Sequence, residues 1–377
     1  MGDVVHRGRR RGSSYTGGID LLASLAGPAE SPLVLDLEAL AGALPQPFTT
    51  AAAAAAGLSP DVLARGVRRG LLVRLAHGVY VLARVWGDAG ACGQHLLLVS
   101  AAVSQRPGAC VTHHSAALLH GLPMPIDCPR FVSLTTDRTH RASAPPASDR
   151  LRNAALPRDH VIVWRGVPVT TPGRTVIDCL RELTLPDAVA IADAAVRGGL
   201  TTVPELRRLR RLQRRWPGIR AADDGIALID PLRETWLESW SFTRLWQLGV
   251  PVPESQVLVF DARGTLIGRV DGLWRERATV AEADGLGKYL GQLNPDGPSG
   301  EAAARLVLAE KVREDRLRGT GLEVVRWGFR DIRREAHAVV EQIGAAWERG
   351  DFGRFRGRLV ASPGPALRAN SWALRAR

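Results

Sequence analysis

The sequence predicts an α/β (α+β) protein in which helices and strands alternate along most of the chain. Segments with apolar residues at helical spacing, such as VPELRRLRRLQRRW, are interleaved with short apolar runs of strand length, such as RFVSLTT and HVIVWRGVPVT. The 377 residues are 45% hydrophobic, which is enough for two or three domains with buried cores.

The charge of the chain favours a polyanionic partner. The formal net charge is +12 and the sequence pI is about 10.8. DNA is favoured over a membrane because the sequence contains no long apolar run and no lipidation signal. Of the 50 basic residues, only Lys288 and Lys311 are lysines. Either their position is chance, or they mark a site that needs a compact ammonium group.

The cysteines and the N-terminal segment indicate a cytoplasmic protein. The segment HRGRRRG is followed by SSYTGGIDLLASLAG, which glycines and Asp20 interrupt before a signal-peptide core forms. Residues 1–44 are therefore expected to be a basic arm and linker, or an over-long start. No C-x-x-C spacing is present, and reduced core thiols are expected. The four cysteines are Cys92, Cys110, Cys128 and Cys179.

Residues 45–84 carry the element order of a winged helix-turn-helix. Thr49 or Thr50 can cap an alanine-rich helix, and Ser59 with Pro60 starts a second helix that Gly70 ends. Two short apolar runs, LLVRL and VYVL, follow and are joined at a His-Gly turn. In such a motif the second helix enters the major groove and the hairpin meets the phosphate backbone.

Four arginines are candidates for DNA contact on this motif. They lie on the second helix and next to the hairpin, where they would bind phosphates or guanine edges. The alternative is a small three-helix module that binds protein and whose arginines are merely solvated. The four are Arg65, Arg68, Arg69 and Arg74.

Residues 90–228 are predicted to form a mixed α+β middle domain. Thr202 and Glu205 have the spacing of a capping box. Arg174 and Asp178 are one helical turn apart and are expected to pair. The histidines of the THHSAALLHGL segment lack carboxylate or cysteine partners at metal-ligand spacing. We therefore interpret His113, His114 and His120 as helix-cap or core residues.

The third segment, residues 229–345, contains an unusual set of carboxylates. A helix in ETWLESWSFTRLWQLG precedes three strands predicted to be antiparallel, and a helix, a strand and a last helix follow. Strand alternation puts Glu282 and Asp284 on one face, about 7 Å apart. Asp271 on the neighbouring strand joins them if the register brings it alongside. Residues 346–377 are expected to be a basic C-terminal tail.

Three carboxylates this close together repel one another unless a cation is bound. Oxygen ligands favour Mg²⁺ or Mn²⁺, and such an ion beside a phosphodiester polarises it and activates water. Lys288 would then stabilise the transition state or help to activate that water. The sequence therefore predicts a catalytic metal site made of Asp271, Glu282 and Asp284.

The run RVDGLW…AEADGLGKY…EKVREDRLRGTGLEVVRWGFRDI, preceded by ETWLESW, resembles the Vsr-like branch of the PD-(D/E)xK endonucleases, in particular actinobacterial proteins of that branch. The similarity covers about residues 230–335 and implies a restriction-endonuclease-like α-β sandwich. By this resemblance Asp271 and Glu282 are the metal-binding acids, and Glu238 is the acidic residue of the first helix. Asp284 stands where the superfamily has its usual lysine, which Lys288 would replace from the following turn. The same resemblance gives supporting or phosphate-contacting roles to Glu310, Lys311 and Arg313.

The segments TTAAAAAAGLSPDVLARGVRRGLLVRLAHGVYVL, THHSAALLHGLP and GVPVTTPGRTVIDCL resemble a second family, the AbiEi-like antitoxins and transcriptional regulators of type IV toxin-antitoxin systems. This resemblance implies an AbiEi-like middle domain at residues 90–228, repression of the chain's own promoter, and a cognate toxin protein as a partner. It implies no catalysis.

Two functions follow, from different classes. The first is a DNA-binding, Mg²⁺-dependent endodeoxyribonuclease. The alternative is a non-catalytic regulator or antitoxin with a degenerate nuclease domain, in which Arg269, Arg275 or Arg277 neutralise the carboxylates. A third, an arginine-driven nucleic-acid chaperone, leaves the carboxylates unexplained. The substrate form and the choice between monomer and homodimer stay open.

Overall fold

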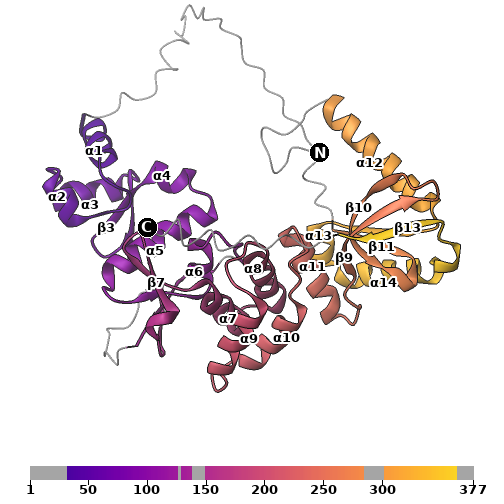
Figure 1. The fold of residues 1–377 in the computed structure, drawn as a ribbon. Coiled ribbons are helices and arrows are strands. Elements are labelled where there is room, and N and C mark those ends of the chain that lie inside the picture. Colours follow the sequence, from indigo (N-terminus) through magenta and orange to yellow (C-terminus); the bar gives the residue numbers. More distant parts are fainter. Residues whose placement is uncertain (1–31, 126–128, 138–148, 284–300, 363–377) are drawn as a thin grey trace, which may run out of the picture. The chain divides into compact units, whose positions relative to one another are not determined.

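The computed structural model describes residues 32–125, 129–137, 149–283 and 301–362 (Figure 1). The described residues contain helices and three sheets, which confirms the predicted mixed α and β class. They fall into two compact units: the first runs to residue 84 without residues 75–77, and the second contains the rest. Within the described residues, no helix has both the length and the apolar character needed to cross a membrane.

The first unit has the predicted winged-helix order. Ser59 Oγ accepts a hydrogen bond from the Val62 amide and so caps the second helix of the motif, with Pro60 in its first turn. Gly78, at a φ of 65°, turns the chain between the hairpin strands. The strand order is β1-β3-β2. The elements are α1 (Pro32–Gly42), β1 (Phe48–Thr49), α2 (Thr50–Ala55), α3 (Pro60–Arg68), β2 (Leu72–Ala76) and β3 (Val79–Leu82).

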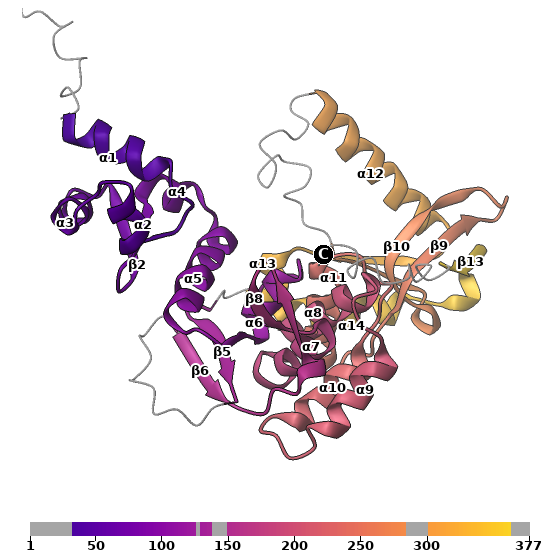
Figure 2. The same ribbon diagram turned by 60° about the vertical axis from the view of Figure 1, so that its left-hand side comes forward.

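The first part of the second unit combines a five-stranded mixed sheet, in the order β6-β5-β4-β8-β7, with a group of helices. Figure 2 shows α7, α8, α9 and α10 next to one another. Their apolar faces form one core that includes Ile177, Leu180, Ile191 and Leu206. The helices are α4 (Ala83–Asp88), α5 (Ala91–Gln105), α6 (His113–Leu119), α7 (Pro172–Glu182), α8 (Leu185–Arg197), α9 (Val203–Leu212) and α10 (Ile219–Leu228). The strands are β4 (Cys110–Val111), β5 (Val132–Thr136), β6 (Asp149–Asn153), β7 (Val161–Trp164) and β8 (Val167–Thr170).

The second part of this unit is a sheet with helices packed on it. Antiparallel β9, β10 and β11 confirm the predicted three strands, and β12 adds in parallel to β11. Side chains of α11 and α14 share a core with Ala281, Ala283 and Trp327 of the sheet. The elements are α11 (Trp236–Gln247), β9 (Glu254–Asp261), β10 (Leu266–Trp274), β11 (Thr279–Ala283), α12 (Glu301–Gly319), β12 (Glu323–Trp327), α13 (Phe329–Arg334), α14 (Ala336–Arg349) and β13 (Gly357–Ala361).

The two parts of the second unit are joined by buried polar contacts. Trp240 Nε1 of α11 donates to Asp187 Oδ1 of α8 at 3.2 Å. Arg233 Nη1, just before α11, lies 3.1 Å from Asp193 Oδ2 of α8, and both side chains are fully buried. The boundary expected near residue 228 is therefore a packed junction rather than an exposed linker.

The C-terminal end of the described chain differs from the expected tail. Residues 357–361 form β13, which pairs antiparallel with β9 from Gly357–Asp261 to Ala361–Val257. The Arg358 guanidinium lies over the Phe260 ring, with its carbon 4.2 Å from the ring centre. The sheet order is therefore β12-β11-β10-β9-β13, and the sheet extends beyond the boundary predicted at residue 345.

Candidate functional site

The exposed face of α3 carries the arginines predicted to contact DNA. Leu63 and Gly66 are buried against the rest of the unit, whereas Arg65 and Arg68 are exposed. The two arginines are three residues apart, so they lie on one face of the helix. Arg69 follows directly after α3 and Arg74 lies on β2, and both are also exposed. The structure therefore gathers the four predicted residues on α3 and the adjoining hairpin.

A close packing contact fixes the position of α3. A Cβ atom added at Gly66 would lie 3.0 Å from Leu72 of β2 and 3.2 Å from Leu37 of α1. A larger residue at this position would push α3 away from its neighbours. The arginines of α3 are therefore presented by a helix that is seated directly on the core of the unit.

The sheet of the second unit brings two of the predicted acids together. The β10–β11 ladder ends with Gly272 opposite Ala281, so Asp271 and Glu282 are the next residues along the two strands. Asp271 Oδ2 accepts a hydrogen bond of 2.9 Å from the Ala283 amide, which holds its carboxylate beside β11. The sequence left this register open, and the observed register brings Asp271 alongside Glu282.

Glu238 has a structural role at the start of α11. Its carboxylate accepts hydrogen bonds from the Glu234 and Thr235 amides, while its own amide donates to Thr235 Oγ1. This arrangement is a capping box, a role of Glu238 that was not predicted from the sequence. The Gln256 side chain of β9 donates to Glu238 Oε2 at 2.8 Å. Glu238 is therefore buried and hydrogen-bonded within the fold.

The partner of Glu282 comes from α12. Arg313 Nη2 lies 3.1 Å from Glu282 Oε1, without hydrogen-bond geometry, and 2.7 Å from Glu310 Oε1. Arg313, which was assigned to DNA contact, is therefore engaged inside the protein, whereas Lys311 is exposed on α12. The three arginines considered as neutralising partners contact other residues: Arg269 pairs with Glu234, Arg275 pairs with Glu254, and Arg277 lies over the Trp347 ring.

Glu282 should make the stability of the protein depend on pH. Burial raises its pKa to about 7, although Arg313 acts in the opposite direction. A folded-state pKa above the unfolded value means that this carboxyl stabilises the fold at low pH and loses that contribution as the pH rises through 7. Relative to Glu282→Gln, the unfolding free energy of the wild type should fall by about 3 kcal/mol between pH 4 and pH 8. Urea denaturation of both proteins measures this, and a constant difference would contradict it.

The described residues do not by themselves fit a magnesium ion at this place. In residues 32–125, 129–137, 149–283 and 301–362, no group of three or more His, Cys, Asp or Glu side chains is placed to hold a metal. Glu238 and Glu282 already have protein partners. Asp284 and Lys288 lie outside the described residues. The metal site that includes them stays a prediction.

A second polar group, in the first part of the unit, connects the histidines to α7. His113 Nε2 lies 3.0 Å from Glu182 Oε1, and His113 Nδ1 lies 2.9 Å from Thr112 Oγ1. Burial alone would raise the pKa of Glu182, but hydrogen bonds with His113 and Arg152 outweigh it and hold that pKa well below its usual range. Burial lowers the pKa of His114 to about 3, so this histidine is neutral. The interpretation of these residues as cap and core histidines is confirmed, and His120 contacts the Thr170 carbonyl oxygen.

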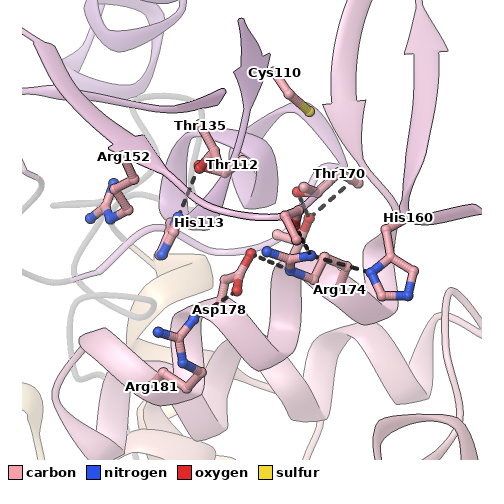
Figure 3. A network of polar contacts seen from close by, with 12 residues as sticks. Cys110, Thr112, His113, Thr135, Arg152, His160, Thr170, Arg174, Asp178 and Arg181 are labelled. Carbon is pink, nitrogen blue, oxygen red and sulfur yellow. Dashed lines mark hydrogen bonds and ion pairs between the residues drawn. The ribbon is translucent and has the colours of Figure 1, made fainter. Parts of the chain in front are cut away.

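Behind this group lies an Arg-Asp-Arg cluster. Asp178 accepts from Arg174 Nε at 2.8 Å and from Arg181 Nη1 at 3.1 Å, which confirms the predicted Arg174–Asp178 pair. Figure 3 shows Asp178 between the two guanidinium groups, with His160 on the far side of Arg174. Asp178 is fully buried, so the cluster is a fixed part of the fold.

Comparison with known proteins relates most of the described part of the first unit, which has the helix and strand order of a winged helix-turn-helix, to one protein family. Residues 36–83 match the family model described as "Transcriptional regulator, AbiEi antitoxin". The segment with the exposed arginines of α3 is therefore similar to the regulator domain of AbiEi antitoxins.

Longer similarities come from Mycobacterium tuberculosis proteins. "Uncharacterized protein MT2308" of strain CDC 1551 / Oshkosh and "Uncharacterized protein Rv2248" of strain H37Rv are each 27% identical over 174 residues, 46% of this chain. The match spans 59% of each of these relatives. The crystal structure of RV2827C protein from the same species is similar over 52% of this chain and 78% of that one, with 16% identity and a TM-score of 0.37.

Proposed function

We propose that the chain is a DNA-binding transcriptional regulator of the antitoxin type, which binds its own promoter and has a toxin protein as its partner. The observation that carries this proposal is the exposed arginine face of α3 in a segment that matches the AbiEi antitoxin regulator model. Guanidinium groups on the second helix of such a motif reach phosphates and base edges in the major groove. The net charge of +12 strengthens the attraction to DNA.

The double variant Arg65→Ala/Arg68→Ala tests this proposal. Two lost phosphate contacts should weaken binding to the chain's own promoter by about 100-fold at 0.1 M salt. The slope of log K against log salt should become shallower by about 2. Fluorescence anisotropy with labelled promoter DNA measures both quantities.

The matched control is Arg158→Ala/Arg214→Ala, which removes the same charge from two exposed positions outside α3. It should keep its promoter affinity within a factor of about two, since salt screens exposed charges that make no direct contact with the DNA. Equal losses in both double variants would mean that the overall charge, and not α3, binds the DNA. If the wild type bound its own promoter no more tightly than other DNA, this would contradict the proposed regulator function.

A second function, metal-dependent DNA cleavage, is favoured by the position of Asp271 beside Glu282 at the end of the β10–β11 ladder. Calorimetric titration of Mg²⁺ or Mn²⁺ tests it. The wild type should bind the ion, Asp271→Asn should not, and plasmid cleavage should be lost in Asp271→Ala and in Glu282→Ala. Absence of a binding heat in the wild type, together with an uncut plasmid, would rule the cleavage function out.

A further inference from the structure

A cavity of about 590 Å³ lies next to the Arg-Asp-Arg cluster. It is lined by residues of β6, of α7, and of the loop between α9 and α10, together with His113 at the start of α6. Its volume is in the range of small-molecule sites, about 300–1,000 Å³. All of these elements belong to the second unit, so the cavity does not depend on α3.

Arginine dominates the lining of this cavity. Glu182 is the single carboxylate among the described lining residues, and Asp178 lies directly behind two of the arginines. Five guanidinium groups against these two carboxylates leave three positive charges, because arginine stays protonated. The lining arginines are Arg150, Arg152, Arg174, Arg181 and Arg215.

Two of these guanidinium groups are held in place before any ligand arrives. Arg174 and Arg181 share Asp178, and their guanidinium carbons lie 4.7 Å and 4.9 Å from the centre of the Trp216 ring. Cation–π contact with Trp216 and ion pairing with Asp178 together restrict both side chains. Binding an anion there costs little side-chain entropy.

Arg152 has an unused donor at the same place. Its Nε and Nη2 atoms donate to the two oxygens of Glu182, as a planar guanidinium does with a carboxylate. Its Nη1 atom is buried and has no hydrogen-bond partner among the residues that the structure describes. A buried N–H group without a partner costs free energy, which an acceptor bound in the cavity would recover. Figure 3 shows Arg152 beside His113, which also lines the cavity.

We propose that this cavity binds a small anion that carries two or more phosphate groups, such as a nucleoside diphosphate. Linked phosphates bring about three negative charges and several oxygens, which match the three excess positive charges and the forked donors of arginine. A ligand with a single carboxylate group would leave most of these positive charges without a partner. The site lies in the middle part of the chain, and its existence does not rest on the proposed promoter binding.

Two exposed arginines at the cavity allow a test that spares the core. Arg150 and Arg215 are exposed, unlike Arg174, so Arg150→Ala/Arg215→Ala is compatible with folding. ADP and inorganic pyrophosphate are titrated into the full chain by calorimetry in 0.15 M salt, and melting temperatures confirm that each variant is folded. Wild type should bind at least one probe, and the double variant should bind it at least about tenfold more weakly, because two charged contacts are lost.

The control is again Arg158→Ala/Arg214→Ala, whose Arg214 is the direct neighbour of Arg215 but does not line the cavity. It should bind the probe within a factor of about two of wild type, and Arg65→Ala/Arg68→Ala should also bind normally. A 12-nucleotide oligothymidylate serves as the nucleic-acid arm. The proposal is overturned if neither small probe binds, if both arginine pairs matter equally, or if the oligonucleotide alone binds. If the protein bound ADP but not its promoter, this would contradict the proposed regulator function and not the anion site.

Discussion

Replacing Asp193 by alanine should lower the unfolding free energy of the second unit by about 3–5 kcal/mol. The carboxylate lies 3.1 Å from Arg233 and accepts a 2.8 Å hydrogen bond from the Asp230 amide. Both members of the pair are fully buried, so the alanine variant leaves a guanidinium without its counter-charge in the interior. Burial raises the pKa of Asp193 to about 6, although Arg233 opposes this, so urea denaturation is best followed at pH 7.5.

Two matched variants separate burial from charge in this experiment. Asp193→Leu/Arg233→Met replaces both partners by apolar groups and should stay within about 2 kcal/mol of the wild type, or exceed it. Asp223→Ala breaks the solvent-exposed Arg210–Asp223 pair and should cost less than about 1 kcal/mol. If Asp193→Ala lowered the unfolding free energy no more than Asp223→Ala, this would contradict the packed junction between α8 and α11.

The second large effect is expected at Gly218, which starts α10. Its φ is +74°, and a Cβ atom there would lie 2.1 Å from the Arg181 carbonyl oxygen at the end of α7. Gly218→Ala therefore combines left-handed strain with a clash against backbone, and should cost about 3 kcal/mol. Chemical denaturation measures this loss.

Gly121 provides the control for Gly218. Its φ is +73°, but an added Cβ atom would meet no described residue within 4 Å. Gly121→Ala should therefore cost about 1 kcal/mol, from backbone strain alone. The difference between the two variants isolates the contact with Arg181. Equal losses would show that α7 and α10 can move apart at this point.

Local features of the fold could be predicted well from the sequence, because their causes lie within a few residues. The Ser59 cap, the Pro60 start of α3 and the Arg174–Asp178 pair all depend on spacings of one to four residues. Even here one detail differs. Thr202 caps α9 as expected, but the Glu205 side chain accepts from Thr201 Oγ1 instead of closing a capping box.

Contacts between distant segments could not be predicted in the same way. Glu182 meets His113 across 69 positions of the chain and Arg152 across 30, and no local pattern in the sequence connects them. The contact between Glu282 and Arg313 could not be predicted either, because Arg313 lies 31 positions after Glu282. Strand alternation indicates that Glu282 shares a face with other acids, but it does not indicate which helix supplies the cation.

The antiparallel pairing of β13 with β9 has a consequence for how the protein behaves at high concentration. Without residues 357–361, β9 would become the outer edge of its sheet, and the unpaired N–H and C=O groups of such an open edge pair with other chains. The strand that covers it is short and carries Arg358, and both properties discourage further strand addition. The last described strand therefore protects the molecule against aggregation through its sheet edge.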